Sequence, residues 1–187
     1  MIALLLAALV AAPRAPRGSP PPQQPVQEEQ LSDAELRDRV DTYLGAIDRP
    51  ITAARWKALG PRAAPILEEV IADQSQFPSR RAKALDGLVA AAPDRAASLV
   101  GKLARDEKQP TVVRVAAVRG AGEVLPPAKA MTELRPVLRG AKSTGMRAHA
   151  AEVLARKAGG CAEVQGQVER EPAENRGAFT RAMKQCQ

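Results

Sequence analysis

Few side chains in this 187-residue sequence could support catalysis or bind a metal. His149 is the single histidine, and Glu152 follows it one helical turn later. A general base needs a nucleophile or a substrate pocket beside it, and no motif marks either, so we interpret His149 as a surface residue. The sequence contains no glycine-rich phosphate loop, no Gly-x-Ser-x-Gly elbow and no cluster with metal-ligand spacing. We therefore expect no enzymatic activity, no cofactor and no metal.

The two cysteines, Cys161 and Cys186, lie near the C-terminus on either side of Pro172. Pro172 divides this region into two segments, which predicts an antiparallel helical hairpin with a cysteine near each end. If the chain is exported we expect a disulfide between the two cysteines, whereas in a cytosolic chain both would be free thiols. Two sulfurs and the distant His149 do not assemble a zinc site.

Arginines recur along the chain at a constant 33-residue interval, at Arg81, Arg114 and Arg147. Each begins a short run in which most residues are small or apolar, as in Arg114-Val-Ala-Ala-Val. Asp73 and Asp106 each precede an arginine by eight residues, whereas the position that matches them before Arg147 lies near Arg139. A fixed period indicates stacked structural repeats, because one helix pair cannot bury its apolar face alone.

The elements that carry these residues are predicted to be helices. Ser32 and Glu35 form a capping-box pattern, and apolar residues at helical spacing follow to about Ile47. Proline and glycine then separate short helical segments, which we expect at residues 52–59, 62–73, 78–91, 93–106, 111–125, 127–140 and 144–158. The short connections make successive helices antiparallel neighbours. Alanine dominates the apolar residues and no run alternates with period two, so the sequence predicts an all-α fold.

The run from Arg114 to Val118, with an aspartate eight positions before it, resembles the HEAT repeat and its bacterial HEAT-like relatives. The resemblance covers about residues 50–158. It implies a short right-handed α-solenoid of antiparallel helix pairs, HEAT-like or armadillo-like. In that family the aspartate and arginine form a ladder of hydrogen bonds between adjacent repeats. The positions that match the ladder are Asp73, Arg81, Asp106 and Arg114, with Arg147 in the third arginine position but without an aspartate partner.

The N-terminal residues precede the predicted helices and divide into two segments. Residues 2–12 are all apolar and would rise about 16 Å as a helix, too little to span a membrane. We interpret residues 1–12 as a candidate secretory signal, although no Lys or Arg precedes the apolar run and Pro13 is unfavourable for a cut after Ala12. A truncated or misassigned start would explain the missing charge, and the alternative is an apolar tail or a helix packed on the domain.

The domain organisation follows from these segments. Residues 13–30 are rich in proline and glutamine and predict a disordered linker. Residues 31–187 are expected to form a single domain, with repeats at about 50–158 and a C-terminal cap at 159–187.

The charge distribution bears on the class of partner. A formal net charge of +7 permits attraction to nucleic acid, but only 2% of residues are aromatic, which leaves few platforms for stacked bases. Solenoids commonly bind along the concave side formed by the second helix of each repeat. Two columns of positions at the 33-residue interval are candidates for that side: Asp86, Arg119 and Glu152, and Lys83, Ala116 and His149. Their charges alternate in sign, whereas a nucleic-acid groove needs a positive stripe.

We therefore expect a non-enzymatic HEAT-like scaffold or adaptor that binds a protein or peptide as a monomer or weak oligomer. The candidate binding residues are Lys83, Asp86, Arg119, His149 and Glu152. Periplasmic or secreted location is expected, with a cytoplasmic location as the alternative. A nucleic-acid-binding HEAT-like protein is one alternative function, although the pocket of the alkylpurine DNA glycosylases, which share this repeat, is not evident. The other alternative is an accessory or lyase-like factor for a cofactor-bearing partner.

Overall fold

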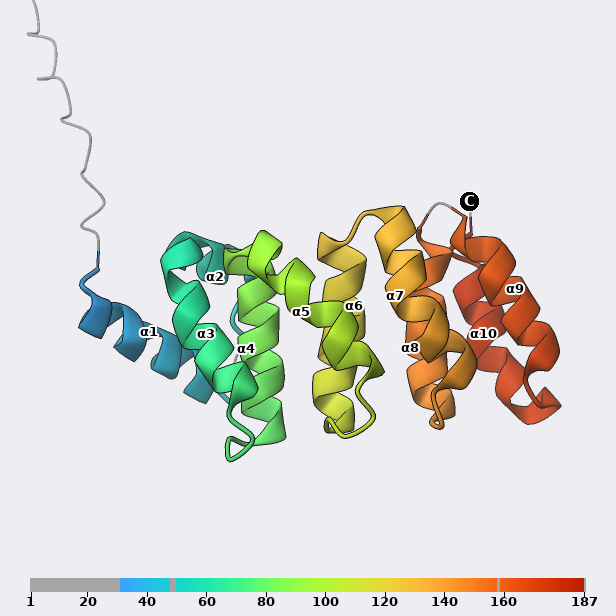
Figure 1. Ribbon diagram of the computed structural model, residues 1–187, viewed down its shortest axis with the longest axis horizontal. Helices are drawn as coiled ribbons and strands as arrows, with labels where there is room; N and C mark the ends of the chain where they lie inside the picture. Colours follow the sequence, from blue (N-terminus) through green and yellow to red (C-terminus); the bar gives the residue numbers. More distant parts are fainter. Residues whose placement is uncertain (1–30, 48–49, 158, 187) are drawn as a thin grey trace, which may run out of the picture. The chain divides into compact units, whose positions relative to one another are not determined.

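The computed structural model describes residues 31–47, 50–157 and 159–186, and within these ranges the chain is helical and contains no strand (Figure 1). The predicted signal segment at residues 1–12 and the predicted linker at 13–30 lie outside the described residues. The helices are α1 (Asp33–Gly45), α2 (Ala53–Leu59), α3 (Ala64–Ala72), α4 (Pro78–Ala91), α5 (Pro93–Arg105), α6 (Thr111–Val124), α7 (Pro127–Gly140), α8 (Thr144–Ala155), α9 (Gly160–Arg170) and α10 (Arg176–Met183).

These bounds confirm the all-α prediction and follow the predicted segments closely. The capping box at the start of α1 is formed, since the Ser32 hydroxyl accepts from the Glu35 amide and the Glu35 carboxylate accepts from the Ser32 amide. The segment predicted at 62–73 differs, because it begins with a 3-10 turn at Pro61–Ala63 before α3. No helix within the described residues has both the length and the hydropathy that a bilayer crossing requires.

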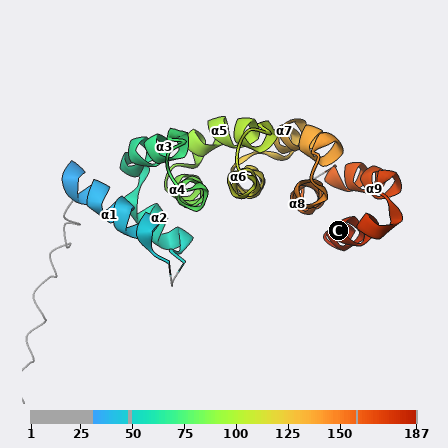
Figure 2. The same ribbon diagram turned by 90° about the horizontal axis from the view of Figure 1, so that it is seen from below.

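The helices from α2 onward lie in two layers, and most of them pack against the next helix but one. In one layer α2 packs against α4, α4 against α6, α6 against α8 and α8 against α10. In the other layer α5 packs against α7 and α7 against α9. Figure 2 shows the two sets on opposite sides, with α3, α5 and α7 on one side and α4, α6 and α8 on the other. Contacts between α3 and α4, α5 and α6, and α7 and α8 join the layers.

The 33-residue interval of the sequence is also the interval at which the helices of one layer begin. Helices α4, α6 and α8 begin at Pro78, Thr111 and Thr144, which repeats the same interval twice. Within them Ala84, Ala117 and Ala150 occupy the same position, and all three are fully buried. Because the distance between helix axes depends on the side chains at the contact, alanine at this position lets neighbouring helices pack closely.

The predicted C-terminal hairpin is formed by α9 and α10, which pack against each other. Cys161 in α9 and Cys186 after α10 form the predicted disulfide, with 5.8 Å between their Cα atoms. Gly160 brings the start of α9 against the end of α8, where a Cβ atom would lie 1.8 Å from the carbonyl oxygen of Leu154. The buried ring of Phe179 adds apolar packing from α10.

Candidate functional site

The two buried arginines at the predicted ladder positions bond to the preceding helix rather than to the predicted aspartates. Arg81 Nε donates to the carbonyl oxygen of Ile71 at 2.9 Å, and Arg114 Nε donates to that of Ala104 at 3.1 Å. These carbonyls belong to the last turns of α3 and α5, where helix geometry leaves carbonyl groups without a partner. Each arginine therefore caps the C-terminal end of the helix before its own, where a positive charge is also favoured by the helix dipole.

Asp73 and Asp106 bond within their own loops, which corrects the prediction of direct Asp–Arg hydrogen bonds. The carboxylate of Asp73 accepts from the amide and hydroxyl of Ser75, at 2.9 and 2.6 Å, and from Gln76. The Ser75 hydroxyl contributes most to a lowered pKa of Asp73, and the charge of Arg81 contributes least. The physical reason is local, because an aspartate before a turn readily accepts from groups two or three residues later.

Gln109 supplies the link between neighbouring helix pairs. Arg81 Nη2 donates to Gln109 Oε1 at 2.8 Å, and Gln109 Nε2 donates to Asp106 Oδ2 at 3.0 Å. The Gln109 hydrogen bond is the largest cause of a lowered pKa of Asp106. Sequence reasoning missed this residue, although Gln76 and Gln109 are separated by the same interval as the arginines and each stands three residues after its aspartate. That recurrence was the available signal.

Arg147, the third arginine, lacks an aspartate as predicted but has another carboxylate partner. Its Nε and Nη2 groups donate to the two oxygens of Glu171 at 2.6 and 2.7 Å. Glu171 lies just after α9, is 2% exposed and also accepts from Gln167. The hydrogen bond from Arg147 is the main cause of a lowered pKa of Glu171, and the same bond raises the pKa of Arg147.

The predicted column of Asp86, Arg119 and Glu152 contains an ion pair rather than three independent contact groups. Arg119 Nη2 donates to both Asp86 oxygens at 2.9 and 2.8 Å and so joins α6 to α4. Both side chains are about half exposed. In α8, His149 Nδ1 lies 3.7 Å from a Glu152 oxygen of the same helix. Asp86 and Arg119 are thus paired with each other across α4 and α6, and Glu152 lies beside His149 within α8.

The second predicted column is not a continuous surface, because its middle member, Ala116, is buried in the core. Lys83, its first member, is half-buried, and its Nζ donates to the carbonyl oxygens of Leu44 and Ala46 at 3.4 and 2.5 Å. Lys83 therefore caps the end of α1 and ties that helix to α4. The structure brings Lys83 close to Asp86 but leaves His149 apart from both.

Lys83 and Asp86 line a pocket of about 170 Å³ between α1, α2 and α4, which we call the Trp56 pocket. Its remaining lining residues are mainly apolar: Tyr43, Ala46, Ile47, Pro50, Ile51 and Trp56. The rings of Tyr43 and Trp56 meet edge to face, with centroids 5.1 Å apart. The absent side chain of Gly87 admits the indole, since a Cβ atom there would lie 3.0 Å from it.

Ile47 distinguishes the Trp56 pocket from the rest of the core. Its side chain is 90% exposed although it belongs to the pocket lining, so an apolar surface faces solvent at the rim. The sequence does not predict this pocket, because the apolar spacing continues the first helix to about Ile47. The chain instead turns after α1, and residues far apart in sequence meet at α4.

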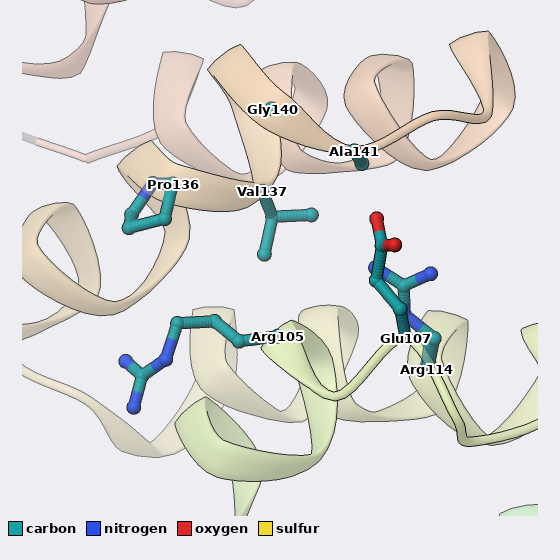
Figure 3. Close-up of a pocket in the computed structure, with 7 residues that line it drawn as sticks. All are labelled: Arg105, Glu107, Arg114, Pro136, Val137, Gly140 and Ala141. Atoms are coloured by element: carbon teal, nitrogen blue, oxygen red, sulfur yellow. The ribbon is translucent and has the colours of Figure 1, made fainter.

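A second pocket, of about 200 Å³, lies beside Arg114 and is called the Arg114 pocket (Figure 3). It is lined by Arg105, Glu107, Arg114, Pro136, Val137, Gly140 and Ala141. Figure 3 shows the Glu107 and Arg114 side chains both reaching toward Ala141 at the end of α7.

No group of three or more potential metal ligands occurs in the part of the chain that the structure describes. Comparison with known proteins adds no relative, since no protein-family model, no curated protein and no solved structure matches this chain.

Proposed function

We propose that this protein is a non-enzymatic HEAT-like scaffold, a short right-handed α-solenoid, that binds a protein or peptide. Binding is assigned to the side formed by α2, α4 and α6, with the Trp56 pocket as the main anchor point. The observation that carries the proposal is this pocket, in which exposed apolar surface lies beside two of the five predicted binding residues, Lys83 and Asp86.

The solenoid assignment is supported by period and packing together. Helices whose first residues recur at the 33-residue interval pack against one another along the layer, and Arg81 and Gln109 link one helix pair to the next. Stacking of equivalent units in this way is typical of repeat proteins, whose extended surfaces commonly bind other proteins.

The Trp56 pocket suits an apolar side chain of a partner. Aromatic walls and a small number of polar groups at the edge are typical of binding pockets and of interface hot spots. Ile47 is already exposed, so covering it removes apolar surface from water at about 25 cal/mol per Å². Asp86, which is 45% exposed at its side chain and paired with Arg119, places polar groups beside that apolar surface.

The charges of this side favour a protein over a nucleic acid. Asp86 neutralises Arg119, and Glu152 lies beside His149, so the layer has no stripe of unpaired positive charge along these positions. Phosphate contacts dominate nucleic-acid affinity and need such a stripe. The proposed location is periplasmic or extracellular, which the Cys161–Cys186 disulfide supports because disulfides persist in oxidising compartments.

Selection from a displayed library of random peptides tests this proposal. We expect enriched peptides that share a large apolar residue and whose affinity falls at least tenfold, about 1.4 kcal/mol, in the Ile47→Ser variant. Phe77→Ser is the matched control, because Phe77 is also exposed, at 79%, but does not line the pocket. Enriched peptides that bind both variants equally would refute the assignment to this pocket.

A further inference from the structure

The three arginines at the 33-residue interval differ in what their guanidinium groups meet. Arg81 donates from Nη2 to an amide oxygen of Gln109, and Arg147 donates from Nε and Nη2 to the carboxylate of Glu171. For Arg114 only the Nε bond to Ala104 is formed among the described residues. The residue 33 positions after Gln109 is Lys142. Its ammonium group carries only donors, so it cannot accept a hydrogen bond from Arg114 as Gln109 does from Arg81.

The Nη groups of Arg114 are buried yet reachable. The residue is 8% exposed and lines the Arg114 pocket, toward whose far wall its guanidinium extends in Figure 3. Among the described residues, Gln167 Oε1 is the one fully sealed side-chain polar atom without a partner. The Arg114 Nη groups are therefore open to the pocket, where a ligand can reach them.

Around the Arg114 pocket the neighbouring charges neutralise one another, and the charge of Arg114 remains as a net charge of about +1. Arg105 is paired with Glu133, and Lys142 lies 3.6 Å from Glu107. Arg114 has no ion-pair partner of its own among the described residues. A ligand with a single negative charge would therefore neutralise the pocket. A carboxylate meets this requirement, whereas a phosphate dianion would exceed it and would lie close to Glu107.

We propose that the Arg114 pocket binds a carboxylate, which accepts hydrogen bonds from the Nη1 and Nη2 groups of Arg114. A planar guanidinium and a carboxylate match as a bidentate pair, and charge-assisted bonds of this kind are stronger than neutral ones. The fold already contains such a pair in Arg147 and Glu171. There the arginine at the equivalent repeat position donates to a carboxylate of the same chain. Pro136, Val137 and Ala141 offer an apolar wall to the carbon chain behind the carboxylate.

The Arg114 pocket is distinct from the Trp56 pocket, because the two share no lining residue. Carboxylate binding at the Arg114 pocket therefore does not depend on the function proposed for the Trp56 pocket. The carboxylate can come from an acidic side chain of a bound protein or from a small free acid. Both sources present the same chemistry to Arg114, and separate probes distinguish them.

The test is a ¹H–¹⁵N NMR titration that follows the Nε–H signal of Arg114 and the backbone amides of Glu107 and Ala141. The probes are sodium acetate, an end-blocked pentapeptide with one central glutamate, its glutamine counterpart and inorganic phosphate, all at equal ionic strength. We expect saturable shifts with the glutamate peptide and at least tenfold weaker binding of the glutamine peptide. Acetate that matches the glutamate peptide identifies a free acid as a sufficient ligand, whereas weaker acetate binding identifies a peptide side chain.

A pair of glycine variants locates the binding. Gly140 and Gly45 each end a helix, and a Cβ atom at either meets no atom within 4 Å, so both positions have room for the first atom of a side chain. Gly140→Leu places a side chain at the Arg114 pocket and should abolish the shifts, while Gly45→Leu should preserve them. The proposal is overturned if the wild-type signals do not move, if the glutamine peptide or phosphate binds as tightly as the glutamate peptide, or if Gly140→Leu binds normally.

Discussion

Arg81 donates to Gln109 at 2.8 Å across the boundary between two helix pairs, and Gln109 in turn donates to Asp106. The hydrogen-bonded connection that the sequence pattern assigned to aspartate and arginine alone thus includes a glutamine between them. One amide side chain satisfies a buried guanidinium and a loop carboxylate together.

Replacing Gln109 with alanine should lower the free energy of unfolding by about 1–3 kcal/mol, because it leaves a buried donor of Arg81 without its acceptor. Chemical denaturation measures this loss. Gln76→Ala is the matched control, since Gln76 bonds Asp73 in the same way within its own loop. A smaller loss is expected there, and an equal loss would show that the Arg81 contact contributes nothing.

Replacing Glu171 with glutamine should destabilise the protein by about 3 kcal/mol, because breaking one partner of a buried ion pair leaves the other charge uncompensated. Glu171 is 2% exposed at its side chain and Arg147 is 15% exposed. Thermal unfolding of Glu171→Gln beside Glu174→Gln, an exposed glutamate of the same region, measures the difference. Two variants with the same melting temperature would contradict a stabilising pair.

Acid stability should depend on the same carboxylate. The pKa of Glu171 is lowered below its ordinary value of 4.5, chiefly by Arg147, so the folded state binds the proton less readily than the unfolded chain. Its contribution is complete above that ordinary value and is lost as the pH falls through the lower folded pKa. Denaturation from pH 6 to pH 2.5 should give a shallower acid-side slope for Glu171→Gln than for the wild type. Parallel slopes would argue against this linkage.

Removing the disulfide by the Cys161→Ser and Cys186→Ser double substitution should lower stability by about 3–4 kcal/mol under the chain-entropy treatment of a loop closed over 25 residues. Denaturation in the presence and absence of reductant measures this. The wild type should respond to reductant and the double variant should not. A wild type that reacts with thiol reagents before reduction would show that the bond is absent from the purified protein.

Most of the fold could be predicted from the sequence because its signals are local and repeated. The helices α4, α6 and α8 follow from apolar spacing, from the proline and glycine breaks and from the recurrence of Arg81, Arg114 and Arg147. The hairpin that joins Cys161 to Cys186 follows from Pro172 between two short helical segments.

The partners of these residues could not be predicted in the same way. Asp106 accepts from Gln109 and from the Lys108 amide because the loop turns back on itself, and a spacing of eight residues to Arg114 does not contain that geometry. Glu171 lies beyond the repeated region, so no period points to it.

The candidate binding residues show the same limit. The sequence predicts Lys83 and Asp86 as contact residues on an open surface, and the structure places them beside Tyr43 and Trp56 of earlier helices to form a pocket. Ala116 was placed in the same column by its interval alone, yet it packs in the core. Contacts between layers decide which side of a helix stays open, and a single sequence does not give them.

The most direct test of the proposed function uses Trp56, the single tryptophan of the chain, which lines the proposed binding pocket. Its fluorescence should change saturably when a selected peptide is added to the wild type or to Phe77→Ser. In Ile47→Ser the same change should require at least tenfold more peptide. A peptide that binds with the same calorimetric affinity to all three proteins, and leaves the emission of Trp56 unchanged, would contradict the account.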